Sequence, residues 1–251
     1  MAQTASVESL VARQAVQAFA SSPLASSVVM GGLPQLRREA LPMGPPLSSV
    51  LPEGGFPRGA VVELTSPANL GHGLSVALAA CAASQRASVE RGREMAWCAF
   101  LDPDHTLFGP AAQSSGVGLD RFLVLYPPRH LLAKVAVRVA LSRIFSVIVV
   151  DVASIPGVAS KGPYRFESMD TWSKVARRLA LAIEKTPTTL FLLTRTEASR
   201  PSALPVAMRV ELENDGTDRL FVRIAKDRFG RVTNHRPIVW TRPVEEKRAA
   251  R

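Results

Sequence analysis

The stretch AVVELTSPANLGHG, residues 60–73, decides the fold. Its first five residues, 60–64, form a short β-branched run that is typical of a buried strand. The Ala-rich residues 74–91 contain few helix breakers and predict a helix. A strand that passes through a short loop into a helix is the opening unit of an α/β sheet, and the free N–H groups at about Gly73 would favour an anion.

The rest of the chain repeats this unit. Further strands are predicted at residues 97–101, 122–126, 146–151 and 189–193, separated by helices at 107–114, 130–144 and 170–185. Strands that are apolar throughout and alternate with helices indicate a parallel sheet covered on both faces. After Pro205 the pattern changes to period two, at 208–212 and 220–224, which predicts antiparallel strands at one edge. We therefore expect an α/β core with a mostly parallel sheet flanked by helices.

The chain divides into three parts by composition. Residues 1–50 contain one predicted helix, 7–20, followed by an arm that Pro and Gly interrupt repeatedly. Residues 51–243 carry the α/β pattern and form the expected core. Residues 244–251 are charged, and we expect this tail to be disordered.

Composition narrows the function. The 251 residues carry a net charge of +10, which attracts nucleic acid or an acidic protein face but also fits an ordinary solvated surface. No apolar run reaches the ~18 residues of a membrane span, and the first 20 residues lack the order of a signal peptide. We expect a cytoplasmic protein that does not contact a membrane. Four His and two Cys form no cluster at metal-ligand spacing, so no metal is expected.

The loop that starts at Ser66 occupies the place of a P-loop, which would read G-x-x-x-x-G-K-[S/T]. Ser66 replaces the first Gly, His72 the Lys and Gly73 the Ser/Thr, so that only Gly71 remains, with Asn69 inside the loop. The Lys would hold the β/γ-phosphates, whereas His is shorter and mostly neutral at pH 7. The hydroxyl would bind Mg²⁺, and Gly73 has none. We expect a degenerate nucleotide-binding loop, weak anion binding at most, no cofactor and no catalytic residue.

Five segments in order resemble RecA recombinases. Residues 54–64 are similar to the G-G-L-P-x-G-x-[IV]-V-E-I lead-in of that family, 100–107 to its F-[IV]-D-A-E-H-A-L segment, and 147–151 to its Walker B strand. Residues 191–195 are similar to F-I-N-Q, and 226–228 to K-x-K. The resemblance covers roughly residues 50–240 and implies a RecA-like core of the P-loop NTPase type.

The same resemblance implies roles for single residues. Asp104 stands where RecA has the Glu that activates water, and Asp151 is the vestigial Walker B acid. Thr194 replaces the Gln that senses the γ-phosphate. Without a nucleotide we expect a structural role for Asp151, such as a hydrogen bond to the loop at 66–73. Of the two DNA-binding loops of RecA, the first would fall near 156–169, and residues 196–205 are far too short for the second, which argues against strand exchange.

A RecA-like chain with a decayed P-loop, a helical N-terminal extension and a basic tail resembles the ImuA family of SOS mutagenesis factors. That resemblance implies work in translesion synthesis with an ImuB-type polymerase relative, with RecA and with the ImuC polymerase. The related SulA division inhibitors are shorter and lack the extensions. Three alternatives stay open: a DNA-dependent ATPase or recombination factor, a direct but weak DNA binder, and a SulA-like inhibitor.

A basic interaction surface is expected on the helices and near the chain's end. Lys134 and Arg138 are four apart and share a helix face, whereas Arg143 points away from them. Later cations complete the candidate set, which a solvated face explains equally well: Arg177, Arg178, Lys226 and Arg228.

Overall fold

The computed structural model describes residues 39–67, 72–153, 169–195 and 204–240. Several predicted features lie outside these ranges. They are the helix at 7–20, the tail at 244–251, the loop residues Asn69 and Gly71, and most of the two segments compared with the DNA loops of RecA. Among the helices in these ranges, none has the length and apolar composition of a membrane span.

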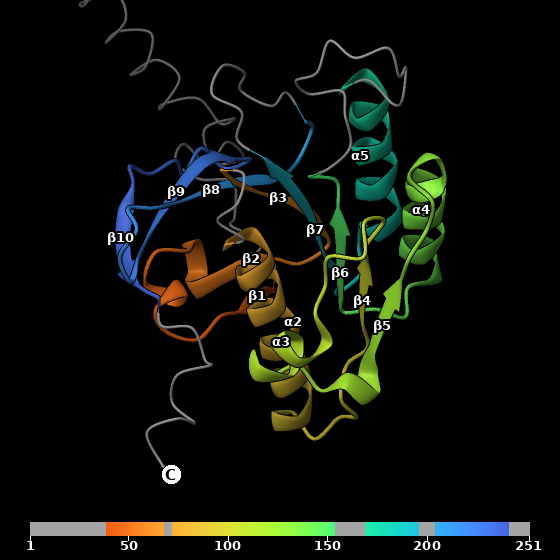
Figure 1. Cartoon of the computed structure of the whole chain (residues 1–251), viewed down its shortest axis with the longest axis horizontal. Helices are drawn as coiled ribbons and strands as arrows, with labels where there is room; N and C mark the ends of the chain where they lie inside the picture. Colours follow the sequence, from red (N-terminus) through yellow and green to blue (C-terminus); the bar gives the residue numbers. More distant parts are fainter. Residues whose placement is uncertain (1–38, 68–71, 154–168, 196–203, 241–251) are drawn as a thin grey trace, which may run out of the picture. The chain divides into compact units, whose positions relative to one another are not determined.

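An eight-stranded sheet forms the centre of the described chain (Figure 1), in the order β10-β9-β8-β3-β7-β6-β4-β5. Five of the strands are parallel to one another and match the predicted apolar runs: β3 (Ala60–Ser66), β4 (Cys98–Leu101), β5 (Phe122–Leu125), β6 (Val147–Asp151) and β7 (Thr189–Arg195). Most of their residues are buried because helices cover both faces of a parallel sheet.

The other edge of the sheet is antiparallel, as the period-two pattern predicted. Strand β8 (Met208–Asn214) still runs parallel to β3, and β9 (Arg219–Asp227) returns antiparallel to β8. The edge strand β10 (Arg236–Val239), which the sequence reading did not predict, pairs antiparallel with β9. The predicted fold class, an α/β core with a mostly parallel sheet and antiparallel strands at one edge, is therefore confirmed.

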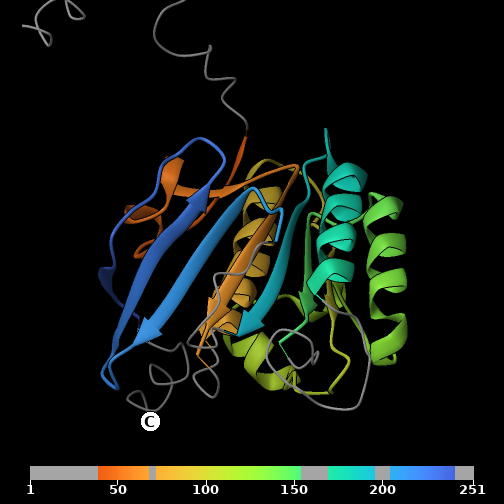
Figure 2. The same ribbon diagram turned by 90° about the horizontal axis from the view of Figure 1, so that it is seen from above.

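Helices cover the two faces in different ways (Figures 1 and 2). The long helix α2 (His72–Glu90) and the short α3 (Gly109–Ser114) lie on one face, and α4 (Leu132–Ser142) and α5 (Met169–Ile183) lie side by side on the other. Alternation along β3 serves both layers, since Val62 and Leu64 point to α2 while Val61 points to α5. Both layers depend on this central strand.

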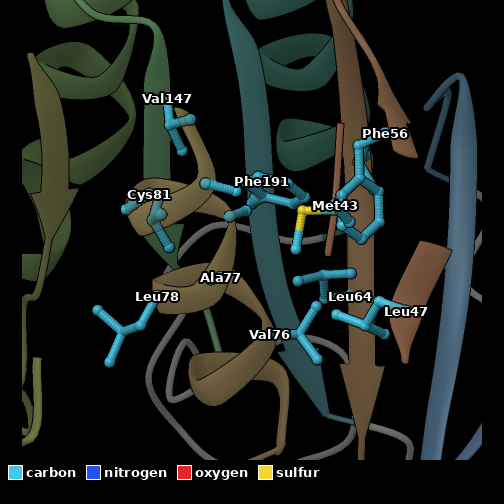
Figure 3. Packing of buried hydrophobic residues seen from close by; sticks show 14 of the residues in the cluster. Met43, Leu47, Phe56, Leu64, Val76, Ala77, Leu78, Cys81, Val147 and Phe191 are labelled. Carbon is cyan, nitrogen blue, oxygen red and sulfur yellow. The ribbon is translucent and has the colours of Figure 1, made fainter. Parts of the chain in front are cut away.

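The compact unit begins at Glu39, whereas the sequence reading started the core at Leu51. Residues 40–57 form a two-stranded sheet, β1 (Ala40–Pro42) with β2 (Gly55–Pro57), joined by two single turns of 3₁₀ helix. This segment packs apolar side chains onto the layer of α2 (Figure 3), where Met43, Leu47 and Phe56 meet residues of α2, β3 and β7. The rings of Phe56 and Phe191 meet edge to face at 4.9 Å between centroids. Residues 40–57 therefore belong to the hydrophobic core on the α2 side of the sheet.

Candidate functional site

The degenerate loop lies where β3 ends and α2 begins. Ser66 closes β3 with 9% of its surface exposed, and His72 opens α2 with 4% exposed. A Cβ added at Gly73 would lie 3.6 Å from Ser66 Oγ and 3.8 Å from Leu193 Cδ2. The first turn of α2 therefore packs directly on the carboxyl ends of the strands, and the His72 side chain is buried in the protein.

The end of β4 carries an acidic residue that the sequence reading did not single out. Asp102 is fully buried and its carboxylate accepts hydrogen bonds from Leu107 N (2.8 Å), Thr106 Oγ1 (3.3 Å) and Asp104 N (3.3 Å). A short polar side chain that binds backbone N–H groups ahead of it is the mechanism of an Asx turn. The sequence Asp102-Pro103-Asp104 directly after an apolar strand carried this signal.

Asp104 is ion-paired. The Nε of Arg129 donates to Asp104 Oδ1 at 2.7 Å, and the Arg side chain is half-exposed while the carboxylate is mostly buried. Beside this pair, the ring of His105 stacks on Tyr126 with 4.3 Å between centroids. The acid at the position of the family's water-activating residue thus has a guanidinium as its partner.

Asp151 ends β6, next to β4 in the sheet. Its Oδ1 accepts a hydrogen bond from the backbone N–H of Ala153 at 2.9 Å, so the bond described for it lies within its own turn. Burial raises the pKa of Asp151 above its ordinary 3.8, and the nearby carboxylates of Asp102 and Asp104 raise it further, against the lowering by the Ala153 N–H. The carboxyl ends of β4 and β6 therefore hold three acids close enough to influence one another.

Thr194, at the position of the family's phosphate sensor, contacts a buried charge. Its hydroxyl donates to Glu63 Oε1 at 2.9 Å, and Glu63 is fully buried in β3. Arg209 of β8 approaches Glu63 with 4.0 Å between Nε and Oε2, and Glu211 with 3.4 Å between Nη2 and Oε1. Sequence reasoning missed this network, although a Glu inside a β-branched run was a visible signal.

The candidate basic residues divide into groups. Lys134 and Arg138 are exposed on α4, and Arg177 and Arg178 are exposed on α5, the neighbouring helix. Arg143 follows α4 in the left-handed conformation, φ 57°, and caps its end.

The remaining pair belongs to the antiparallel edge. Lys226 lies in β9 and donates to Leu204 O at 3.2 Å, and Arg228 follows β9 with its guanidinium 4.8 Å from the Phe229 ring. The seven cations predicted as one surface therefore come from two regions of the fold. Five belong to α4, its C-terminal cap and α5, and two belong to the antiparallel edge of the sheet at β9.

Comparison with known proteins agrees with this architecture. No family model matches the chain. It is 31% identical to Protein RecA of Oceanobacillus iheyensis over 149 residues, which cover 56% of this chain and 40% of that protein. Protein RecA of Staphylococcus aureus and of Desulforapulum autotrophicum match at 31% identity over 155 and 154 residues, covering 59% of this chain and 42% of each. The chain thus spans about two fifths of the length of these relatives, and it is distantly related to RecA over part of its own length.

Proposed function

We propose that this chain is a non-catalytic RecA-like accessory factor of the SOS DNA-damage response. In this proposal it assists error-prone translesion synthesis through contacts with an ImuB-type polymerase relative, with RecA and, in addition, with the ImuC polymerase. The observation that carries the proposal is the composition of the junction between β3 and α2, where His72 is buried and Gly73 has no side chain. The resemblance to ImuA-type chains and the partial similarity to RecA support the assignment to DNA damage.

The residues at this junction do not fit magnesium and a nucleoside triphosphate. A P-loop needs a lysine ammonium at the β/γ-phosphates and a hydroxyl on Mg²⁺. His72 is 4% exposed, so its ring is packed inside the protein, and Gly73 has no side chain. The N–H groups at the start of α2 remain, and they favour an anion only weakly without a cation beside them.

The acids at the neighbouring strand ends support the same conclusion. A general base must be free to accept a proton from water, and Asp104 is held by Arg129 instead. Asp151 bonds to its own turn. Thr194 donates its hydroxyl to Glu63. Each position that would read or cleave a phosphate has an intramolecular partner, which favours a structural role.

A nucleotide-binding measurement tests the proposal. We expect no saturable Mg-ATP binding by calorimetry at millimolar nucleotide and no ATP turnover above a protein-free blank, with or without DNA. The variant His72→Lys/Gly73→Thr introduces the lysine and the hydroxyl of a P-loop and is measured alongside the natural chain. The space at Gly73 admits a Cβ at ordinary contact distance. Gly73→Ala is the matched control. Turnover in the natural chain that is lost in Asp104→Asn or Asp151→Asn would refute the proposal and favour a DNA-dependent ATPase.

Complementation separates the accessory role from the other candidates. In a strain that lacks the gene, we expect damage-induced mutagenesis to fall and to be restored equally by the natural chain, Asp104→Asn and Asp151→Asn. Failure of either Asn variant to complement while it folds normally would contradict a non-catalytic role. Cell filamentation on overexpression would instead indicate a SulA-like inhibitor.

A further inference from the structure

The outward side of α4 and α5 combines cations with exposed aliphatic side chains. Lys134, Arg138 and Leu141 follow one face of α4 at spacings of four and three residues. On α5 the corresponding positions are Lys174, Arg177, Arg178 and Leu181. The opposite sides of both helices contribute Ala136, Ala140, Ala176 and Leu179 to the core. The five cations and two leucines named above therefore point away from the sheet, and we call them the α4/α5 outer face.

The cations of this face have no acidic partner among the described residues. None of the ion pairs found in residues 39–67, 72–153, 169–195 and 204–240 includes one of its five Lys and Arg side chains. Like charges four residues apart on a helix repel one another, as Lys134 with Arg138 and Lys174 with Arg178 do here. Binding of an anionic partner would relieve that repulsion, because the face is cationic without internal compensation.

Two leucines lie among these cations. Leu141 is 58% exposed and Leu181 is 70% exposed, although both belong to well-formed helices. Single-stranded nucleic acid is held by exposed aromatic rings next to cations, and the aromatic residue of these helices, Trp172, is only 4% exposed. Exposed aliphatic side chains beside cations fit a protein segment that offers leucine-type residues together with carboxylates.

Charge argues against two occupants of the α4/α5 outer face, namely a second copy of this chain and the chain's own terminal segments. A second copy carries a net charge of +10 and would be repelled by the face. Residues 1–38 and 241–251 each contain more Lys and Arg than Asp and Glu, so neither end of the chain complements it. The occupant is therefore a different, acidic molecule.

We propose that the α4/α5 outer face docks an acidic amphipathic helix of a partner protein, with carboxylates on the five cations and apolar side chains on Leu141 and Leu181. This rests on the proposed function, in that an accessory factor acts through its contacts, and it adds the chemistry of one contact. The helix-on-helix geometry gives the partner an i, i+3/i+4 pattern of Leu and Glu.

A designed peptide tests the docking. The probe is a fluorescein-labelled 20-residue peptide with Leu and Glu at helical spacing, compared by fluorescence anisotropy with a scrambled peptide of the same composition and with a duplex DNA of 20 base pairs. We expect the patterned peptide to bind at least tenfold more tightly than the scrambled one. Arg138→Glu/Arg177→Glu should lose at least tenfold in affinity, and Leu141→Ser/Leu181→Ser a similar amount.

The matched control is Arg93→Glu/Arg236→Glu, which changes the net charge equally at exposed cations elsewhere and should stay within twofold. Thermal unfolding of each variant shows that it is folded. Equal binding by the natural chain and both face variants overturns the docking site. Loss on the arginine but not the leucine substitutions, together with tighter DNA than peptide binding, overturns it in favour of nucleic acid. Neither outcome affects the nucleotide assays above, so this proposal and the non-catalytic function fail separately.

Discussion

The two layers on either side of the sheet differ in what covers them. Helix α2 packs on the sheet and has the segment 40–57 beside it on the same face, and Val76, Ala77 and Leu78 are all buried (Figure 3). Among the described residues, α4 and α5 pack on the sheet and on one another, and their outer sides are exposed.

This difference separates stability from interaction. The helix that would receive a nucleotide is the more deeply enclosed one, because its starting residue, His72, is buried along with the body of the helix. Helices α4 and α5 carry the exposed leucines and the cations that have no acidic partner in the part of the chain that the structure describes. In this fold the layer that contains the β3–α2 junction is enclosed, and our docking proposal concerns the opposite layer.

The largest effect on the free energy of unfolding should come from the buried ion pair between Arg209 and Glu63. Arg209→Met leaves the Glu63 carboxylate buried without its guanidinium, which should lower the free energy of unfolding by about 3–5 kcal/mol. Urea unfolding measures this. The double variant Glu63→Met/Arg209→Met removes both charges and should recover most of the loss. If the double variant is no more stable than Arg209→Met, the loss in Arg209→Met does not come from an unpaired Glu63 carboxylate.

A matched pair of leucines compares the layers directly. Leu78→Ala in α2 should cost about 2–5 kcal/mol because Leu78 is 3% exposed. Leu181→Ala in α5 should change the free energy of unfolding by less than about 0.5 kcal/mol because Leu181 is 70% exposed. Chemical denaturation of both variants gives the comparison. Similar losses at the two positions would show that the outer side of α5 is covered in solution.

The smallest effect concerns pH. The pKa of Asp151 is raised in the folded chain, so the native carboxyl keeps its proton more firmly than the unfolded one, and stability falls as pH rises from 3.8 through the native pKa. Asp151→Asn removes this penalty and should raise the melting temperature at pH 7 by less than the change that Leu78→Ala causes. The gain should shrink as pH approaches 3.8. A gain that is the same at pH 4 and pH 7 would assign the effect to packing instead.

Local pattern was sufficient for most of the fold. The apolar runs at 60–64 and 147–151 became β3 and β6, and the Ala-rich residues 74–91 became α2, since buried parallel strands and helices have distinct periods and compositions. The loss of Lys and Ser/Thr at positions 72 and 73 is also written in the sequence. Strand β10 and the packing of residues 40–50 were not visible, because short edge strands and proline-rich covers carry little periodicity.

The sequence by itself determined the α/β class, the His and Gly at positions 72 and 73, and the excess of positive charge, because each is a property of residue types in order. Only the tertiary structure decided which partner each polar group meets. Arg129, which follows β5, reaches Asp104, which follows β4, and Thr194 of β7 reaches Glu63 of β3. The neighbouring helices α4 and α5 bring two separate sets of exposed cations onto one side of the sheet. Contacts of this kind depend on sheet order and helix placement, which a local pattern does not encode.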